Sequence, residues 1–277
     1  MSRFGKLLNF ELKRFMKIYV VLIAITIISQ IIGVIVLSKS YLRLANEAIY
    51  EHGESMAQFI DWNGMMSMVR VIGSMWFMGP IGLSAAALIF YIFLIWYRDW
   101  FGKNTFIYRL LMIPTSRLNV FLAKATAIMM MVIGLVSIQL FLLPIESRIL
   151  KGIVPKDFRM DLDVAGIISH SEYLGIIIPQ SFIEFVLYYG LGFMAMMILF
   201  TAILFERSYR IKGIIMAAIY CCLAVVVFIL PILVNDLVAV NLLYPLEVLV
   251  LEIVMGLIVI SASIWVSGFL LKNSVTV

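Results

Sequence analysis

Long apolar runs alternate with shorter polar segments along this chain. Residues 18–37 contain no charged side chain, and twenty helical residues rising about 1.5 Å each cover roughly the 30 Å of a bilayer's hydrocarbon core. Five further runs have a similar length and polarity. The pattern predicts an all-α polytopic membrane protein with six transmembrane helices, at residues 18–37, 73–97, 119–143, 180–205, 213–234 and 246–271.

The composition supports this fold class. Of the 277 residues, 64% are hydrophobic and 13% are charged, whereas a soluble domain is close to half apolar and a quarter charged. No polar segment is long enough for an inserted soluble domain, so residues 1–277 are expected to form one transmembrane domain. The net charge of +5 indicates no nucleic-acid partner, because the basic residues flank the predicted spans.

The distribution of lysine and arginine predicts the orientation. Fourteen of the 21 basic residues lie before the first span, between spans two and three or at the start of span three, between spans four and five, or after the last span, and the other seven lie on the opposite side. Basic residues favour the cytoplasmic side. Both termini are therefore expected in the cytoplasm, and the short outer segments suit a multi-pass protein of the bacterial cytoplasmic membrane.

The segment between the second and third predicted spans, residues 98–118, is both charged and aromatic. Phe106, Leu110 and Ile113 share one helical stripe at i, i+4 and i+7. Pro114 should end that helix, and the hydroxyl residues after it can cap the next one. The residues singled out here are Arg98, Asp99, Phe106, Tyr108, Arg109, Leu110, Pro114, Ser116 and Arg117.

The first seventeen residues have a related character. They mix Phe4, Leu7, Leu8 and Phe15 with five cations, as an amphipathic helix lying in the membrane interface would. An ordinary basic anchor before the first span is an alternative interpretation, and it is compatible with the first.

These features together resemble the permease subunits of type-2 ATP-binding-cassette (ABC) exporters. The N-terminal amphipathic helix and the six spans match that family's topology. The sequence from Arg98 reads R-x10-R-L-L-M-I-P-T-S-R-x6-K and ends at Lys124. It is similar to the family's segment in which a charged residue leaves span two, a leucine-rich helix follows, and Pro-x-Ser-Arg leads to a lysine in span three.

The resemblance implies a coupling mechanism and partners. In that family the helix between spans two and three docks into a separate ATPase, and closure of two ATPases rocks two permease subunits. Phe106 and Leu110 would be the apolar anchors, and Arg109 would pair with a carboxylate on the ATPase. The alternative is that this stripe lies on the inner leaflet.

No cofactor is expected in this chain itself. It lacks the G-x-x-x-x-G-K-[ST] phosphate-binding pattern, so ATP and Mg²⁺ would be bound by the ATPase partner, and the chain would not be an enzyme alone. The second permease subunit would be an identical or a different chain. Gly82 with Ala86, or Ser263 with Ser267, has the spacing of small residues that permits close helix contact.

Three carboxylates lie in or near apolar runs, namely Glu184, Glu247 and Glu252. Intramembrane carboxylates are candidates for a transport pathway. All three lie near the outer ends of their predicted spans, so an interfacial position is the alternative; Glu252 is the deepest. No metal site is expected, because the acidic outer segment lacks EF-hand spacing and the many methionines are read as packing residues.

The sequence therefore predicts a permease that moves an amphipathic or hydrophobic molecule outward, such as an antimicrobial peptide, an antibiotic or a lipid-like compound. A non-transporting sensory or immunity subunit with the same docking helix is an alternative. A membrane-embedded enzyme is a further one, but His52 and His170 lie outside the spans and no H-E-x-x-H is present.

Overall fold

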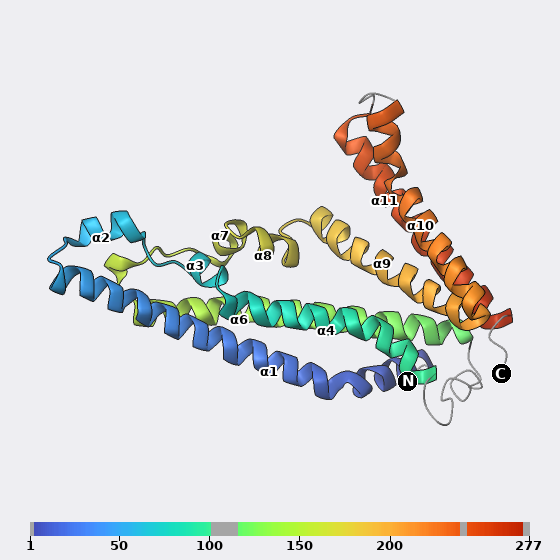
Figure 1. The fold of residues 1–277 in the computed structure, drawn as a ribbon, viewed down its shortest axis with the longest axis horizontal. Coiled ribbons are helices and arrows are strands. Elements are labelled where there is room, and N and C mark those ends of the chain that lie inside the picture. The colour runs from blue at the N-terminus through green and yellow to red at the C-terminus, as the bar shows by residue number, and fades with distance from the viewer. Residues whose placement is uncertain (1–2, 101–115, 239–242, 274–277) are drawn as a thin grey trace. The chain divides into compact units, whose positions relative to one another are not determined.

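The computed structural model describes residues 3–100, 116–238 and 243–273. The described residues form helices of two kinds (Figure 1). The long helices are α1 (Arg3–Asn46), α4 (Met75–Trp100), α6 (Arg117–Ile153), α9 (Phe182–Tyr209), α10 (Ile211–Leu233) and α11 (Pro245–Asn273). The short ones are η1 (Glu47–Glu51), α2 (Met56–Asn63), α3 (Met68–Ile72), η2 (Lys156–Phe158), α7 (Val164–Ser169), α8 (Glu172–Ile177) and η3 (Val234–Val238).

Six helices are long and apolar enough to cross a membrane, which confirms a multi-pass α-helical membrane protein. Each predicted span coincides with one of them, but the helices extend beyond the apolar runs. Residues 3–17 continue into the first span without a break. The helix of the third span runs through Pro144 to Ile153, although the apolar run suggested an end at residue 143. A proline removes one backbone donor, and a long helix can tolerate that loss.

The chain divides into two compact units. Unit 1 comprises residues 1–14, 88–130 and 181–277, and unit 2 comprises residues 15–87 and 131–180. Each of α1, α4 and α6 contributes residues to both units.

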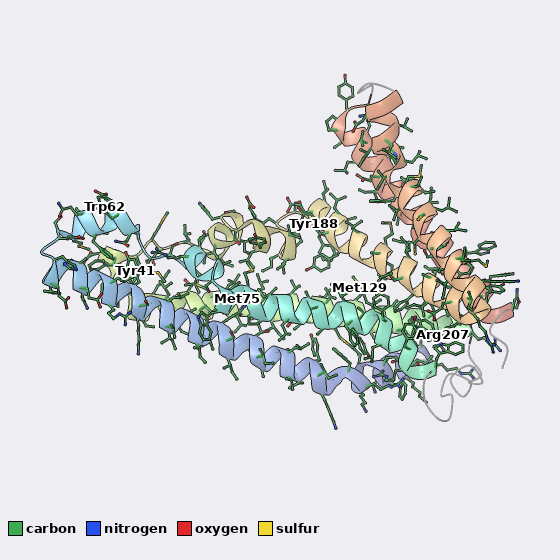
Figure 2. The ribbon with its side chains drawn as sticks, viewed as in Figure 1. Tyr41, Trp62, Met75, Met129, Tyr188 and Arg207 are labelled. Carbon is green, nitrogen blue, oxygen red and sulfur yellow. The ribbon has the colours of Figure 1, made fainter. Side chains whose placement is uncertain are left out.

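The core of unit 2 lies between the long helices and a cap of short ones. Buried side chains of α1, α4 and α6 pack with those of α2, α3, α7 and α8; the largest include Tyr41, Phe59, Phe77, Leu143 and Leu150. Figure 2 labels Tyr41 near α2, and its hydroxyl donates to the carbonyl of Gly64 at 2.8 Å. The short helices therefore close one end of the bundle formed by the three long ones.

A proline in α4 leaves a backbone carbonyl available to a hydrogen-bond donor on α1. Pro80 lies inside α4 and has no N–H to donate to the carbonyl of Trp76 one turn earlier. The hydroxyl of Ser29 on α1 donates to that carbonyl at 2.9 Å. Close approach is possible because Gly33 on α1 faces Trp76, where an added Cβ would lie 2.5 Å from the Trp76 Cβ.

In unit 1, α9 contacts both α10 and α11, and α10 and α11 lie side by side (Figure 1). A hydroxyl network joins them. Thr201 lies 2.9 Å from the Ser267 hydroxyl, and Tyr220 lies 2.6 Å from the Ser263 hydroxyl. Ser263 and Ser267 are fully buried, so this small-residue pair serves contacts within the chain and is not available as a seam between two subunits.

The turn between α9 and α10 is tight. Arg210 has φ 54° and is the non-glycine residue with positive φ in the described chain. Three residues later, Gly213 is buried against the backbone of α9. A Cβ at Gly213 would overlap the carbonyl oxygen of Phe205 and lie 2.9 Å from the Cα of Glu206. A glycine is therefore required where the two helices separate.

We expect Gly213→Ala to destabilise unit 1 by about 1–3 kcal/mol, because the backbone of α9 would have to shift. The apparent melting temperature of the purified protein in detergent measures this. Gly192→Ala is the matched control, since nothing lies within 4 Å of the position that its Cβ would occupy. Equal melting temperatures for the two variants would contradict the steric requirement.

Candidate functional site

A buried cluster of charges lies in unit 1 where α4 ends and α6 begins. Its centre is Lys124, whose side chain is fully buried. The ammonium Nζ donates to Oε1 of Glu11 at 2.8 Å, to Oδ2 of Asp99 at 2.5 Å and to the carbonyl of Ile95 at 2.9 Å. These three bonds use all three donors of a lysine.

Two arginines complete the cluster. Arg14 Nη1 donates to the second oxygen of Asp99 at 2.6 Å. The second oxygen of Glu11 lies 3.7 Å from Arg98 and 3.9 Å from Arg14. We call these five residues, Glu11, Arg14, Arg98, Asp99 and Lys124, the Lys124 cluster. The arginine side chains are 22% and 27% exposed, whereas both carboxylates and the lysine are buried, so the cluster opens to its surroundings on the arginine side.

Aromatic rings cover the other side of Lys124. The ammonium lies 5.2 Å from the ring centroid of Trp96, a favourable cation–π distance. Trp96 and Phe121 each pack edge-on against Phe200 of α9, at centroid distances of 5.5 and 5.6 Å. All three rings are fully buried. In such a low-dielectric setting ion pairs are strong when complete, and removing one partner is costly.

The helical spacing of the sequence explains the geometry. Ile95 and Asp99 are one turn apart on α4, so the carbonyl of the first and the carboxylate of the second reach the same ammonium. Glu11 and Arg14 are three residues apart on α1 and lie on one face. Each of the three helices therefore contributes charge to the same point.

Further contacts fix the ends of neighbouring helices in unit 1. Tyr97 on α4 donates to the carboxylate of Glu206 on α9, and the guanidinium of Arg207 lies over the Tyr97 ring at 4.6 Å. Arg207 is labelled near the end of α9 in Figure 2. Arg117, the first residue of α6, donates to the carbonyl of Leu271 at 2.6 Å, which gives a partner to a carbonyl in the last turn of α11.

The structure describes four of the nine predicted coupling residues. Arg98 and Asp99 belong to the Lys124 cluster, Arg117 binds the end of α11, and Ser116 is exposed directly before α6. The remaining ones lie outside the described residues, namely Phe106, Tyr108, Arg109, Leu110 and Pro114.

The predicted pathway carboxylates are placed near helix starts. Glu184 forms a capping box with Ser181 at the beginning of α9, and Glu247 accepts from the backbone N–H of Tyr244 at 2.9 Å before α11. Carboxylates are stabilised at such positions by free backbone donors and the helix dipole. Glu252 lies farther along α11 and is partly buried. A transport role for these residues stays a prediction.

Sequence reasoning missed three residues of interest. Glu11 and Arg14 belong to the segment interpreted as a basic interfacial helix, and Glu146, just beyond the third predicted span, was not singled out. One signal was present for Glu11, because it is the single carboxylate among the first seventeen residues. Its pairing with a lysine 113 positions later has no local signature.

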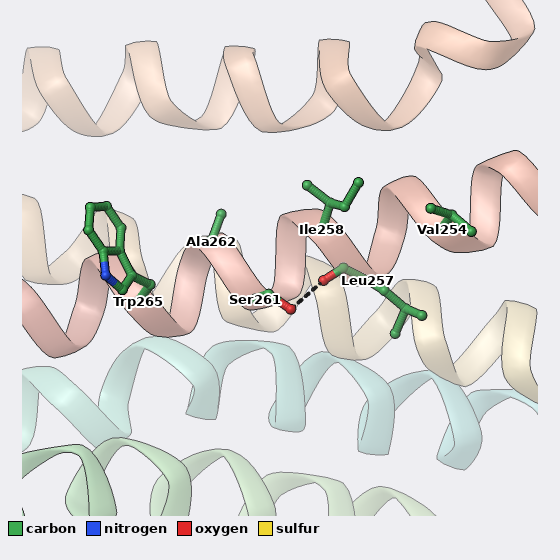
Figure 3. Close-up of a pocket in the computed structure, with 6 residues that line it drawn as sticks. All are labelled: Val254, Leu257, Ile258, Ser261, Ala262 and Trp265. Atoms are coloured by element: carbon green, nitrogen blue, oxygen red, sulfur yellow. Dashed lines mark hydrogen bonds between the residues drawn. The ribbon is translucent and has the colours of Figure 1, made fainter.

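A hollow on the surface of α11 carries no comparable chemistry. Its lining comes from one helix, and Figure 3 shows these side chains, Val254, Leu257, Ile258, Ser261, Ala262 and Trp265. The one hydroxyl among them, that of Ser261, donates to the Leu257 carbonyl of the same helix at 2.8 Å. Among the described residues, no group of three or more His, Cys, Asp or Glu side chains could hold a metal ion.

No family model, curated protein or solved structure matches this chain. Function is therefore inferred from the Lys124 cluster and the sequence around it.

We expect Lys124→Met to destabilise the protein by about 3–5 kcal/mol, because two buried carboxylates lose their shared partner. The apparent melting temperature should fall clearly, while Lys212→Met, at an exposed basic position, should leave it unchanged. Adding Glu11→Gln to Lys124→Met should recover part of the loss. A single variant as stable as the control would show that the ammonium is not held as described.

Proposed function

We propose that this chain is the permease subunit of a type-2 ABC exporter and that residues 98–118 are its coupling element. The observation that supports this most directly is the Lys124 cluster. Asp99 precedes residues 101–115 and Lys124 follows them, and the 2.5 Å contact between the two side chains joins the flanks of the segment.

The contact between Asp99 and Lys124 would transmit a movement of the coupling segment to the transmembrane helices. A push on the coupling segment would reach α4 through Asp99 and α6 through Lys124 at the same time, since the two residues are bonded to each other. Glu11 and Arg14 would pass the displacement to α1. Charge-assisted hydrogen bonds are short and directional, so three helices would respond together.

The N-terminal part of α1 fits the same scheme. Phe10 and Met16 are exposed, while Glu11 between them is bonded into the cluster. One face of the helix is thus held by charge pairs, and the Phe10 ring lies 5.0 Å from the Arg14 guanidinium. The exposed apolar side chains would contact lipid headgroups and acyl chains, as those of an interfacial helix do. We place this end of the helices in the cytoplasm, in line with the excess of basic residues there.

The partners follow from this assignment. Two copies of an ATP-binding-cassette ATPase would supply ATP and Mg²⁺ binding, and a second permease subunit would complete the pathway in a bacterial cytoplasmic membrane. The transported molecule would be amphipathic or hydrophobic, such as a peptide, an antibiotic or a lipid-like compound. Glu184, Glu247 and Glu252 would meet it near the outer side.

Co-purification with the ABC ATPase encoded beside this chain tests the assignment. We expect a stable complex with ATPase activity, and we expect Phe106→Ala with Leu110→Ala to abolish the complex, because truncating buried apolar anchors commonly costs an interface about 2 kcal/mol or more each. The control is Ile211→Ala with Lys212→Ala, a double change at exposed positions at the start of α10.

A complex that survives the first double change would contradict the docking assignment. A complex that forms but moves no substrate would favour the sensory or immunity alternative.

Glu252→Gln tests the outer pathway. If the Glu252 carboxylate contacts the transported molecule, the neutral variant should lower substrate-stimulated ATPase activity several-fold while basal activity stays the same. Glu247→Gln is the comparison, since that carboxylate is exposed and bonds the backbone before α11. Wild-type stimulation in Glu252→Gln would support a purely interfacial position.

A further inference from the structure

A second buried carboxylate lies in unit 2, on α6. The Glu146 side chain is fully buried, and neither of its carboxylate oxygens has a hydrogen-bond partner. Among the described residues, no ion pair includes it. This is the reverse of the Lys124 cluster, in which the buried carboxylates are paired with cations.

The surroundings of Glu146 are apolar. Leu143 and Leu150, one turn before and after it on α6, are fully buried in the core of unit 2, so Glu146 lies on the same face. The following charged residues on the elements around this core are exposed: Lys39, Arg43, Asp61, Arg70, Arg148, Lys151, Asp163 and Glu172. The Arg70 guanidinium lies 5.7 Å from the ring centroid of Tyr41, and Glu47 of η1 pairs with Arg43. Arg159 is partly buried and bonds Asp161 and two backbone carbonyls.

A second unsatisfied polar side chain can be placed from the register of α1 and α6. The hydroxyl of Tyr19 donates to the carbonyl of Met131 at 3.1 Å, and the amide of Gln30 donates to that of Gln139 at 3.0 Å. The two helices therefore run in the same direction.

Ser38 lies eight residues beyond Gln30, and Glu146 lies seven residues beyond Gln139. At about 1.5 Å per residue both are about 10–12 Å farther along. Ser38 is also fully buried, and its hydroxyl has no partner. Two unsatisfied polar side chains thus occur at one level of neighbouring helices.

An ionised carboxylate in this position would be very unfavourable. Without a cation or hydrogen-bond donors, a buried charge takes up or loses a proton instead of remaining ionised. A neutral carboxylic acid costs far less and carries an O–H that can donate.

We propose that Glu146 is a proton-binding site in the core of unit 2, loaded when α1 and α6 pack as they do here. When water reaches the side chain, the O–H bond breaks, the electron pair stays on the carboxylate, and the proton passes to water. Repacking takes one proton up again. Low pH therefore favours the packed arrangement of unit 2, and high pH favours its opening. This inference goes beyond the proposed function and does not rest on it.

Infrared spectroscopy of the full-length protein in lipid nanodiscs tests the proposal. At neutral pH the wild type should show the carbonyl stretch of a protonated carboxylic acid, shifted in heavy water and missing in Glu146→Gln. Glu247→Gln, which removes an exposed carboxylate, should retain the band. A folded wild type without this band overturns the proposal whatever the variants do, and so does a carboxylate band that depends on added sodium or magnesium ions.

The pH dependence of stability gives a second readout. Free glutamate loses its proton near about pH 4.3, so above that value the unfolded chain binds fewer protons than a folded state with neutral Glu146. Stability then falls as pH rises above about 5. The melting temperature of the wild type should decline over this range more steeply than that of Glu146→Gln. Parallel profiles would overturn the proposal.

Discussion

The buried ammonium of Lys124 is the constraint on which the arrangement of unit 1 depends. A lysine at full burial is tolerated only when all its donors have acceptors, and here these come from α1 and α4 while the lysine itself belongs to α6. The surrounding rings of Trp96, Phe121 and Phe200 exclude water and bring α9 against the same point. Polar bonds set the register, and aromatic packing sets the environment that makes those bonds strong.

The two units differ in whether a buried carboxylate is paired with a cation. In unit 1 the carboxylates are matched by cations, which favours one fixed arrangement. In unit 2, Glu146, Ser38 and atoms of the Gln30–Gln139 pair are left without partners, which favours an arrangement that can change. Membrane helices have little hydrophobic drive to associate with one another, so these polar groups have a large share in deciding which parts hold firmly and which parts can open.

The sequence was informative where the physics is local. Apolar runs predicted the long helices, because spanning a bilayer requires about twenty uncharged residues. The same rule does not give the ends of the helices, since the helix of the third span continues into polar sequence and through Pro144. Asp99 was singled out from its motif, but its partners were not. Glu11 and Lys124 are 113 positions apart, and only the packing of three helices brings them together. Glu146 was missed because it lies just beyond the apolar run that ends at residue 143.

The bond between Ser29 and the carbonyl left free by Pro80 has a consequence for how this sequence can change over time. If position 80 became an ordinary helix former, its backbone N–H would donate to the Trp76 carbonyl. A hydroxyl at position 29 would then no longer be needed as the donor. If Ser29 alone were lost, a carbonyl between two helices would lack a donor. The two positions, 51 residues apart, should therefore vary jointly among related chains, with the hydroxyl kept wherever the proline is kept.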